Sequence, residues 1–115
     1  MNIKDFMEIQ NEFDKKHGWS NSEAKTIAKK IDQLKDDIVG FTGEMGEFSN
    51  IVKKISREPS DEMDIFFENN IENMNEEIVD VFIYLLRIMI TLDIDLEKEY
   101  LKKLEFNERR FKKFE

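Results

Sequence analysis

The sequence predicts an all-α protein: a bundle of four to five helices forming one domain over residues 1–115. Apolar residues recur at alternating spacings of three and four along most of the chain, which is the spacing of one helix face. No alternation with a period of two, the pattern of a half-buried strand, is present. Only one proline interrupts the chain and 40% of its residues are hydrophobic, so long helices with a buried face are expected.

Two helices are expected in the first half of the chain. A short apolar stripe over residues 3–13 predicts the first, and the segment 17–19 predicts its end. Ser20 followed by Glu23 fits a capping box, which begins a second, long helix over residues 22–56. The apolar seam of this helix advances in steps of four and three: Ile27, Ile31, Leu34, Ile38, Phe41, Met45, Phe48, Val52 and Ile55.

The second half of the chain predicts a connection and a third helix. Residues 57–70 hold the only proline together with two asparagines, which predicts a connection with room for one short helical turn at 63–67. The third helix, over residues 71–92, keeps the helical spacing but is apolar on nearly every side. A monomer of 115 residues has too little chain to cover such a helix. We therefore expect a homodimer or homotetramer whose interface includes the third helix.

A last helix follows a tight turn. Asp93 to Asp95 predicts the turn, with Asp95 as the N-cap of a fourth helix that carries Leu96, Tyr100, Leu104 and Phe111. Because the turn is short, we expect the third and fourth helices to lie antiparallel.

Composition argues against several classes of function. The net charge of −8 argues against a nucleic-acid partner, because affinity for a phosphate backbone comes mostly from lysine and arginine. The absence of cysteine and the presence of a single histidine, His17, argue against a zinc site and a Ser-His-Asp triad. The longest apolar run, 78–92, contains Asp80 and Arg87 and falls short of the roughly 20 residues of a membrane span. We expect a cytoplasmic protein with no membrane partner, because the N-terminus is polar and lacks a signal-peptide pattern.

Two acidic pairs at helical i, i+3 spacing are the strongest functional signal: Glu44 with Glu47, and Glu77 with Asp80. Both carboxylates of such a pair project from one side of a helix, one turn apart. If the two helices face each other, four carboxylates converge in an all-oxygen environment that suits a hard divalent cation. Two carboxylates about 4 Å apart repel by roughly 4 kcal/mol at an effective dielectric near 20. Convergence therefore requires a cation or bound protons.

Each acidic pair alone is more simply a solvated helix face, since acidic residues number 26 of 115. Asp80 fits that interpretation poorly because it lies within the most apolar stretch; an ion pair with a neighbouring helix is the structural alternative. Gly40, Gly43 and Gly46 recur within the second helix, where each costs about 1 kcal/mol relative to alanine. Close helix packing or space for a ligand beside Glu44 explains them, and the sequence does not decide between the two.

Five further residues are candidates for substrate binding. Lys103, Asn107 and Arg110 share one helix face and suit phosphate oxygens, although basic residues also favour helix C-termini for electrostatic reasons. Tyr84 lies one turn after the second acidic pair, where it serves either the site or the core. Trp19 lies beside the predicted helix break, as a base-stacking platform or as a core residue.

Together these segments resemble the MazG-like all-α nucleoside triphosphate pyrophosphatases and their dCTP pyrophosphatase relatives. The family pattern E-x-x-E followed by E-x-x-D is matched at 44–47 and 77–80. The family's K-x-x-x-N-x-x-R is matched at 103–110. The resemblance covers residues 38–56 and 76–111, roughly half the chain.

The resemblance implies a helical bundle that dimerises, sometimes pairing again to a tetramer. It also implies Mg²⁺, with Mn²⁺ as an alternative, held by Glu44, Glu47, Glu77 and Asp80. The implied reaction is hydrolysis of a (deoxy)nucleoside triphosphate to a monophosphate and pyrophosphate. On this hypothesis Glu47 orients the attacking water.

The same hypothesis assigns the phosphate contacts. Lys103 and Arg110 hold the triphosphate, and Asn107 assists. A different class of function, a non-catalytic helical dimerisation or interaction module, explains the apolar seams and the acidity. That alternative does not explain Asp80 or the glycines. Within the same superfamily, phosphoribosyl-ATP or dUTP hydrolysis is a further alternative.

Overall fold

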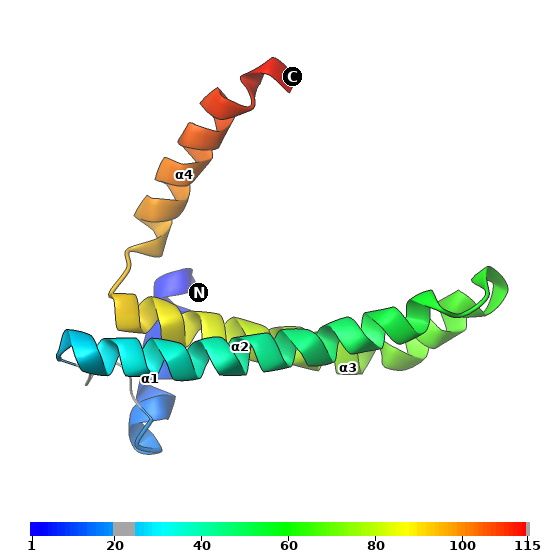
Figure 1. Ribbon diagram of the computed structural model, residues 1–115, viewed down its shortest axis with the longest axis horizontal. Helices are drawn as coiled ribbons and strands as arrows, with labels where there is room; N and C mark the ends of the chain where they lie inside the picture. The colour runs from blue at the N-terminus through cyan, green and yellow to red at the C-terminus, as the bar shows by residue number, and fades with distance from the viewer. Residues whose placement is uncertain (20–24, 115) are drawn as a thin grey trace.

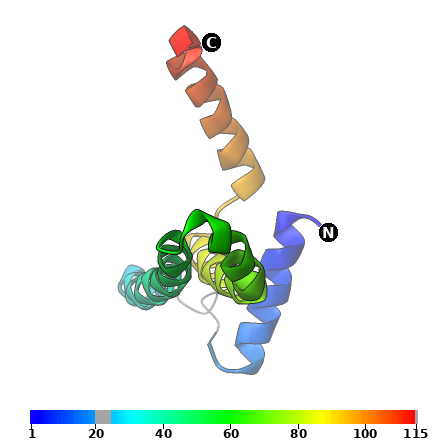
Figure 2. The same ribbon diagram turned by 90° about the vertical axis from the view of Figure 1, so that its right-hand side faces the viewer.

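The computed structural model describes residues 1–19 and 25–114, which contain helices and no strand; the predicted all-α class is confirmed. α2 and α3 form a long antiparallel pair, α1 crosses α3, and α4 projects away from the pair (Figures 1 and 2). The elements are α1 (Ile3–Lys16), α2 (Ile27–Ser56), α3 (Ser60–Leu92), α4 (Leu96–Arg110) and the short 3₁₀ turn η2 (Lys112–Phe114).

α1 begins and ends close to the predicted positions. Asn2 and Asp5 form a capping box, in which each side chain accepts a hydrogen bond from the backbone N–H of the other, at 3.0 and 2.8 Å. The helix ends before Gly18, whose φ of 73° is a left-handed conformation that glycine adopts without strain. Phe6 packs edge-on against Phe82 of α3, with ring centroids 5.8 Å apart, which holds α1 on α3.

α2 begins later than predicted. Its first residue is Ile27 and its N-cap is Thr26, whose hydroxyl oxygen accepts a hydrogen bond from the Lys29 N–H at 3.2 Å. The predicted start at residue 22 is therefore wrong by one turn or more, whereas the predicted end is correct. The predicted capping box of Ser20 and Glu23 lies outside the described residues.

The predicted connection over residues 57–70 is wrong, because α3 begins directly after Pro59. Proline suits this position, where its missing N–H leaves no hydrogen bond unmade. Asn70, interpreted as a loop residue, lies within the helix and donates its side-chain amide to the Phe66 carbonyl at 2.8 Å. Packing of this segment along α2 outweighs its weak intrinsic helix propensity.

The buried core of the single chain is small. On α3, Ile78, Leu85 and Leu92 recur every seven residues and are 41%, 40% and 56% exposed. As expected from the sequence, a single chain leaves part of this helix uncovered. No helix in the described part of the chain is long and apolar enough to cross a bilayer. The buried apolar side chains of α2 and α3 are Ile55, Met74, Val81, Leu86 and Met89.

α4 departs furthest from expectation. The predicted turn is present: Asp93 has a left-handed φ of 51°, and Asp95 caps α4 by accepting a hydrogen bond from the Lys98 N–H at 3.2 Å. The expected antiparallel packing of this helix on α3 is wrong, because α4 turns away from the α2–α3 pair and buries no residue (Figure 1). A short turn brings two helix ends together, but side-chain packing sets the angle between their axes.

Candidate metal centre

Three of the four predicted acidic residues meet between α2 and α3. Glu44 lies in the middle of α2, while Glu77 and Asp80 lie one turn apart on the antiparallel α3. One carboxylate oxygen from each of the three lies within 4.8 Å of the other two. All three residues are half-buried. Helical spacing and antiparallel pairing thus bring together three carboxylates that are far apart in the sequence.

Glu47 lies at the edge of this cluster. Its side chain is exposed, and its oxygens fall outside the group that the other three acids form. Its negative charge is nevertheless close enough to raise the pKa of both Glu44 and Glu77. Glu47 is thus placed beside the cluster and open to solvent.

Two oxygens of the cluster are buried without a donor. With both carboxyl groups ionised, the Oε2 atoms of Glu44 and Glu77 have no hydrogen-bond donor among the residues that the structure describes. Asp80 makes no ion pair with a described lysine or arginine, so a neighbouring helix does not neutralise it. Burying an ionised carboxylate oxygen without a partner is costly, which leaves a proton or a cation to compensate.

The proximity of these carboxyl groups raises the pKa of Glu44 and of Glu77. Two carboxyl groups share a hydrogen bond only when one is protonated, and this interaction with Glu44, aided by burial and by Glu47, raises the pKa of Glu77 to about 7. The same hydrogen bond lowers the pKa of Glu44, but burial and the charges of Glu47 and Asp80 outweigh it and leave that pKa raised. Since metal ligation needs ionised carboxylates, a cation and this proton compete for the same oxygens.

A pocket of about 400 Å³ lies further along the α2–α3 pair, where it meets the end of α1. Tyr84 on the pocket wall comes four residues after Asp80, about 6 Å along the helix axis. Asp37, also on the wall, comes seven residues before Glu44, about 10 Å along α2. The pocket and the acidic cluster are therefore neighbours. The pocket is lined by Gly18, Trp19, Gln33, Asp36, Asp37, Tyr84 and Arg87.

Tyr84 is held in place by close packing. A Cβ atom added at Gly40 would collide with the Tyr84 ring, so only glycine allows this approach. The Arg87 guanidinium also lies over this ring, 5.1 Å from its centroid. Gly43 and Gly46 have open space beside them, so close packing in one chain explains only the first glycine of the series.

Trp19 is not a core residue. It is 55% exposed, and its ring stacks on His17 with centroids 4.9 Å apart and planes inclined by 24°. Its backbone N–H donates to the Asp14 carbonyl at 2.7 Å, which fixes the chain where it leaves α1. Part of the indole is thus available to a planar ligand in the pocket.

An ion pair that the sequence did not predict fixes α1 beside this pocket. The Arg87 Nε and Nη2 donate to the two carboxylate oxygens of Asp14, both at 3.0 Å, and the Gln10 amide donates to the same carboxylate at 3.0 Å. Asp14 is 1% exposed, and its hydrogen bonds to Arg87 are the main cause of a raised pKa for that guanidinium. The visible signal was Arg87 itself, a charge inside the most apolar stretch of the chain.

Lys103, Asn107 and Arg110 are not brought to the acidic cluster within one chain. All three lie on α4, which projects away from α2 and α3 (Figure 2). The Lys103 ammonium lies 4.8 Å from the Phe106 ring centroid, and the Arg110 guanidinium lies 4.9 Å from that of Phe111. In this position of α4, the three side chains do not reach a phosphate group bound at the acidic cluster of their own chain.

Comparison with known proteins does not assign a family: no family model, curated protein or solved structure matches the chain. The similarity to the MazG-like pyrophosphatases thus rests on the motifs alone, and any functional conclusion depends on the geometry of the site.

Proposed function

We propose that this protein is a Mg²⁺-dependent nucleoside triphosphate pyrophosphohydrolase whose metal ligands are Glu44, Glu77 and Asp80. The observation that carries the proposal is the convergence of three carboxylates within 4.8 Å, with two buried oxygens that lack a donor. Mg²⁺ prefers carboxylate oxygens and is usually bound by few of them, with water and substrate phosphates completing its shell. Mn²⁺ accepts the same ligands.

The chain's own residues divide the chemistry among them. Glu47, exposed at the edge of the cluster, orients a water molecule for in-line attack on the α-phosphorus. The new bond joins the water oxygen to that phosphorus, the water's proton is lost to solvent, and the bond from the α-phosphorus to the oxygen bridging it to the β-phosphorus breaks, which releases a monophosphate and pyrophosphate. When bound, Mg²⁺ supplies charge neutralisation at the phosphate oxygens. Lys103, Asn107 and Arg110 are the proposed triphosphate contacts.

The neighbouring pocket suits the nucleoside. Trp19 and Tyr84 provide aromatic surface for a base, and Gln33 and Asp37 provide polar groups on the same walls. The pocket lies one to two helical turns from the acidic cluster, so a base in the pocket directs its phosphates along the seam toward the carboxylates.

The decisive assay is pyrophosphate release from canonical and modified nucleoside triphosphates, with Mg²⁺ or Mn²⁺. Glu77→Gln and Asp80→Asn are expected to lower kcat/KM by at least about 100-fold, since loss of groups that merely support metal ligands already costs 10–100-fold. Glu76→Gln, an exposed neighbour on α3, is the matched control and should keep full activity. Unchanged rates in both ligand variants would rule out the proposed site.

The proposed enzyme is a homodimer, or a homotetramer, that pairs through α3. Support comes from Ile78, Leu85 and Leu92, whose seven-residue spacing forms one exposed apolar row. Leu85→Lys, in the middle of that row, should remove the α3 pairing and lower the sedimentation coefficient, whereas the exposed Glu72→Lys should not.

A non-catalytic interaction module is the second candidate, favoured by exposed apolar side chains on several helices. Ile9, Ile38 and Val79 are 56%, 54% and 53% exposed. Thermal melting with added Mg²⁺ discriminates, because a ligand at 100 times its Kd stabilises the folded state by about 2.7 kcal/mol. An unchanged melting temperature at millimolar Mg²⁺, with and without nucleotide, favours the module.

A further inference from the structure

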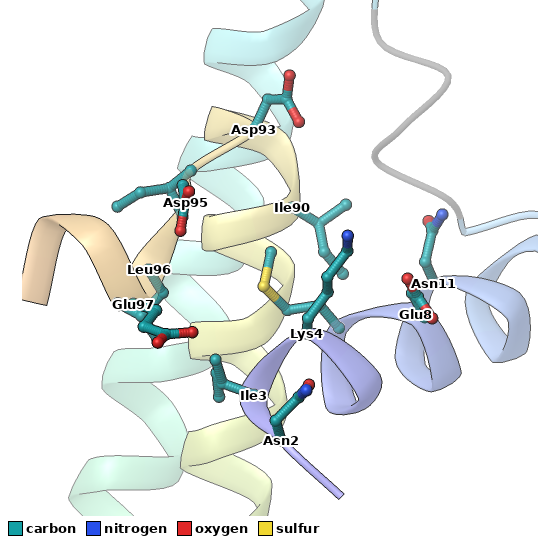
Figure 3. Close-up of a pocket in the computed structure, with 12 residues that line it drawn as sticks. Asn2, Ile3, Lys4, Glu8, Asn11, Ile90, Asp93, Asp95, Leu96 and Glu97 are labelled. Carbon is teal, nitrogen blue, oxygen red and sulfur yellow. The ribbon is translucent and has the colours of Figure 1, made fainter.

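We propose that the basic, aromatic tip of α4 in one copy of this chain docks in the acidic pocket at the base of α4 in a second copy. The tip is the segment 109–114, and the pocket lies where α1, the end of α3 and the first turn of α4 meet (Figure 3). The pocket lies away from the acidic cluster, and Arg110 is the one residue that this inference shares with the enzymatic proposal.

α4 lacks the packing that would hold it as a helix in a single chain. None of its residues is buried, and Tyr100, Leu101 and Leu104 are 61%, 55% and 43% exposed. An isolated helix of this length is marginal in water, because most helical stability in proteins comes from burying an apolar face. A surface outside its own chain is therefore needed to cover α4.

The tip combines aromatic rings with positive charge. Phe111 and Phe114 have ring centroids 6.1 Å apart and are 45% and 73% exposed. Four basic side chains surround them within six residues: Arg109, Arg110, Lys112 and Lys113.

The pocket has the complementary character. It encloses about 590 Å³ above half-buried apolar side chains, among them Ile3, Met7 and Ile90. Figure 3 shows the carboxylates of Asp93, Asp95 and Glu97 along one side, with Glu8 opposite. Lys4 is the single base among the lining residues. An apolar floor with an acidic rim fits two phenylalanines flanked by lysine and arginine.

The tip of the same chain cannot fill this pocket. The first turn of α4 lines the pocket, and the 15 residues of the helix carry the tip about 22 Å away along a rigid axis. A second copy related by a two-fold axis can fill the pocket instead. Each tip then lies in the pocket of the other copy, which gives two equivalent contacts in the dimer. The two α4 helices run antiparallel between the contacts, so that each acidic base faces a basic tip.

Crosslinking tests the contact directly, because the chain has no cysteine of its own. Glu97→Cys marks the pocket rim, Lys112→Cys marks the tip, and Lys54→Cys at the far end of α2 is the control. A mixture of the rim and tip variants, treated with a short bis-maleimide, should give at least about tenfold more linked dimer than the control and tip mixture, since contact raises the effective concentration to the millimolar range. Equal yields from the two mixtures would overturn the proposal.

Charge reversal tests the same contact without removing apolar surface. Glu97→Lys alone and Lys112→Glu alone place like charges at both contacts, so each variant should self-associate less through α4. Mixed together, one of them labelled with ¹⁵N, they restore opposite charges at both contacts and should form the heterodimer preferentially. Native mass spectrometry with both variants in the Leu85→Lys background, which removes the α3 pairing, reads the outcome: a statistical distribution of the two homodimers and the heterodimer argues against the contact.

Discussion

Removing the arginine of the buried ion pair between α1 and α3 is the most direct test of how the fold is held. In Arg87→Met, the Asp14 carboxylate stays 1% exposed but loses two of its three side-chain hydrogen bonds, both of 3.0 Å. Only the Gln10 amide still donates to it. The variant therefore keeps an apolar side chain of similar length in place while it leaves a negative charge buried.

The expected loss is large relative to the total stability. Removing one partner of a buried ion pair costs about 3–5 kcal/mol, because the remaining charge is uncompensated. A domain of this size is stable by roughly 5–15 kcal/mol in total. With a denaturant slope of roughly 2 kcal/mol per molar urea, the unfolding midpoint should fall by about 2 M at unchanged slope.

Urea unfolding followed by far-UV circular dichroism measures this loss. Arg57→Met, at the exposed end of α2, is the matched control and should lie within about 0.5 kcal/mol of wild type. The double variant Asp14→Leu/Arg87→Met should recover much of the stability, because it buries no charge. The reasoning fails if Arg87→Met behaves like the control, or if the double variant is as unstable as the sum of the two single changes.

Individual contacts give three further predictions. Glu77 has a pKa of about 7 in the folded chain against an ordinary 4.5, so the folded state binds more protons within that interval. Its contribution to stability is complete below pH 4.5 and is lost as the pH rises through 7; urea midpoints at pH 5 and pH 8 should differ less in Glu77→Gln than in wild type. Gly40→Ala should destabilise the fold by about 1–3 kcal/mol, because the added methyl group meets the Tyr84 ring. Gly46→Ala adds a methyl group in open space and should stabilise the helix by about 0.5–1 kcal/mol. Equal melting temperatures of the two variants would contradict this reasoning. Asp95→Ala removes the α4 cap and should cost that helix about 1 kcal/mol, visible as faster amide hydrogen exchange at the first turn of α4 and unchanged exchange in α2.

Local pattern was enough to predict most of the helical content. The spacing of apolar residues predicts helices without knowledge of their partners, because the helical period is a property of the chain itself. The end of α2, the turn at Asp93 and the cap at Asp95 follow the same local rules. The helical state of residues 60–70 was not predictable in this way, because the proline and asparagines of this segment indicate a connection. Packing of its apolar residues against α2 is what stabilises the helix there.

The candidate site was predictable to the extent that helical spacing determines it. Two i, i+3 acidic pairs on antiparallel helices bring Glu44, Glu77 and Asp80 together, but spacing does not tell which pair member turns toward the seam, and Glu47 lies outside it. Tyr84 was a candidate because it lies one helical turn after Asp80. That the position of its ring requires a glycine at residue 40 becomes visible only when the two helices are packed.

The helical character of this chain, the ends of several helices and the carboxylates that share a helix face can all be worked out from the residues alone, because they depend on neighbours within one or two turns. That Asp14 meets Arg87, 73 residues later, and that α4 leaves the bundle become visible only once the helices are packed. Such pairings depend on which helix surfaces face each other, and many arrangements of amphipathic helices satisfy the same apolar pattern. The choice among them lies in the fit of particular side chains.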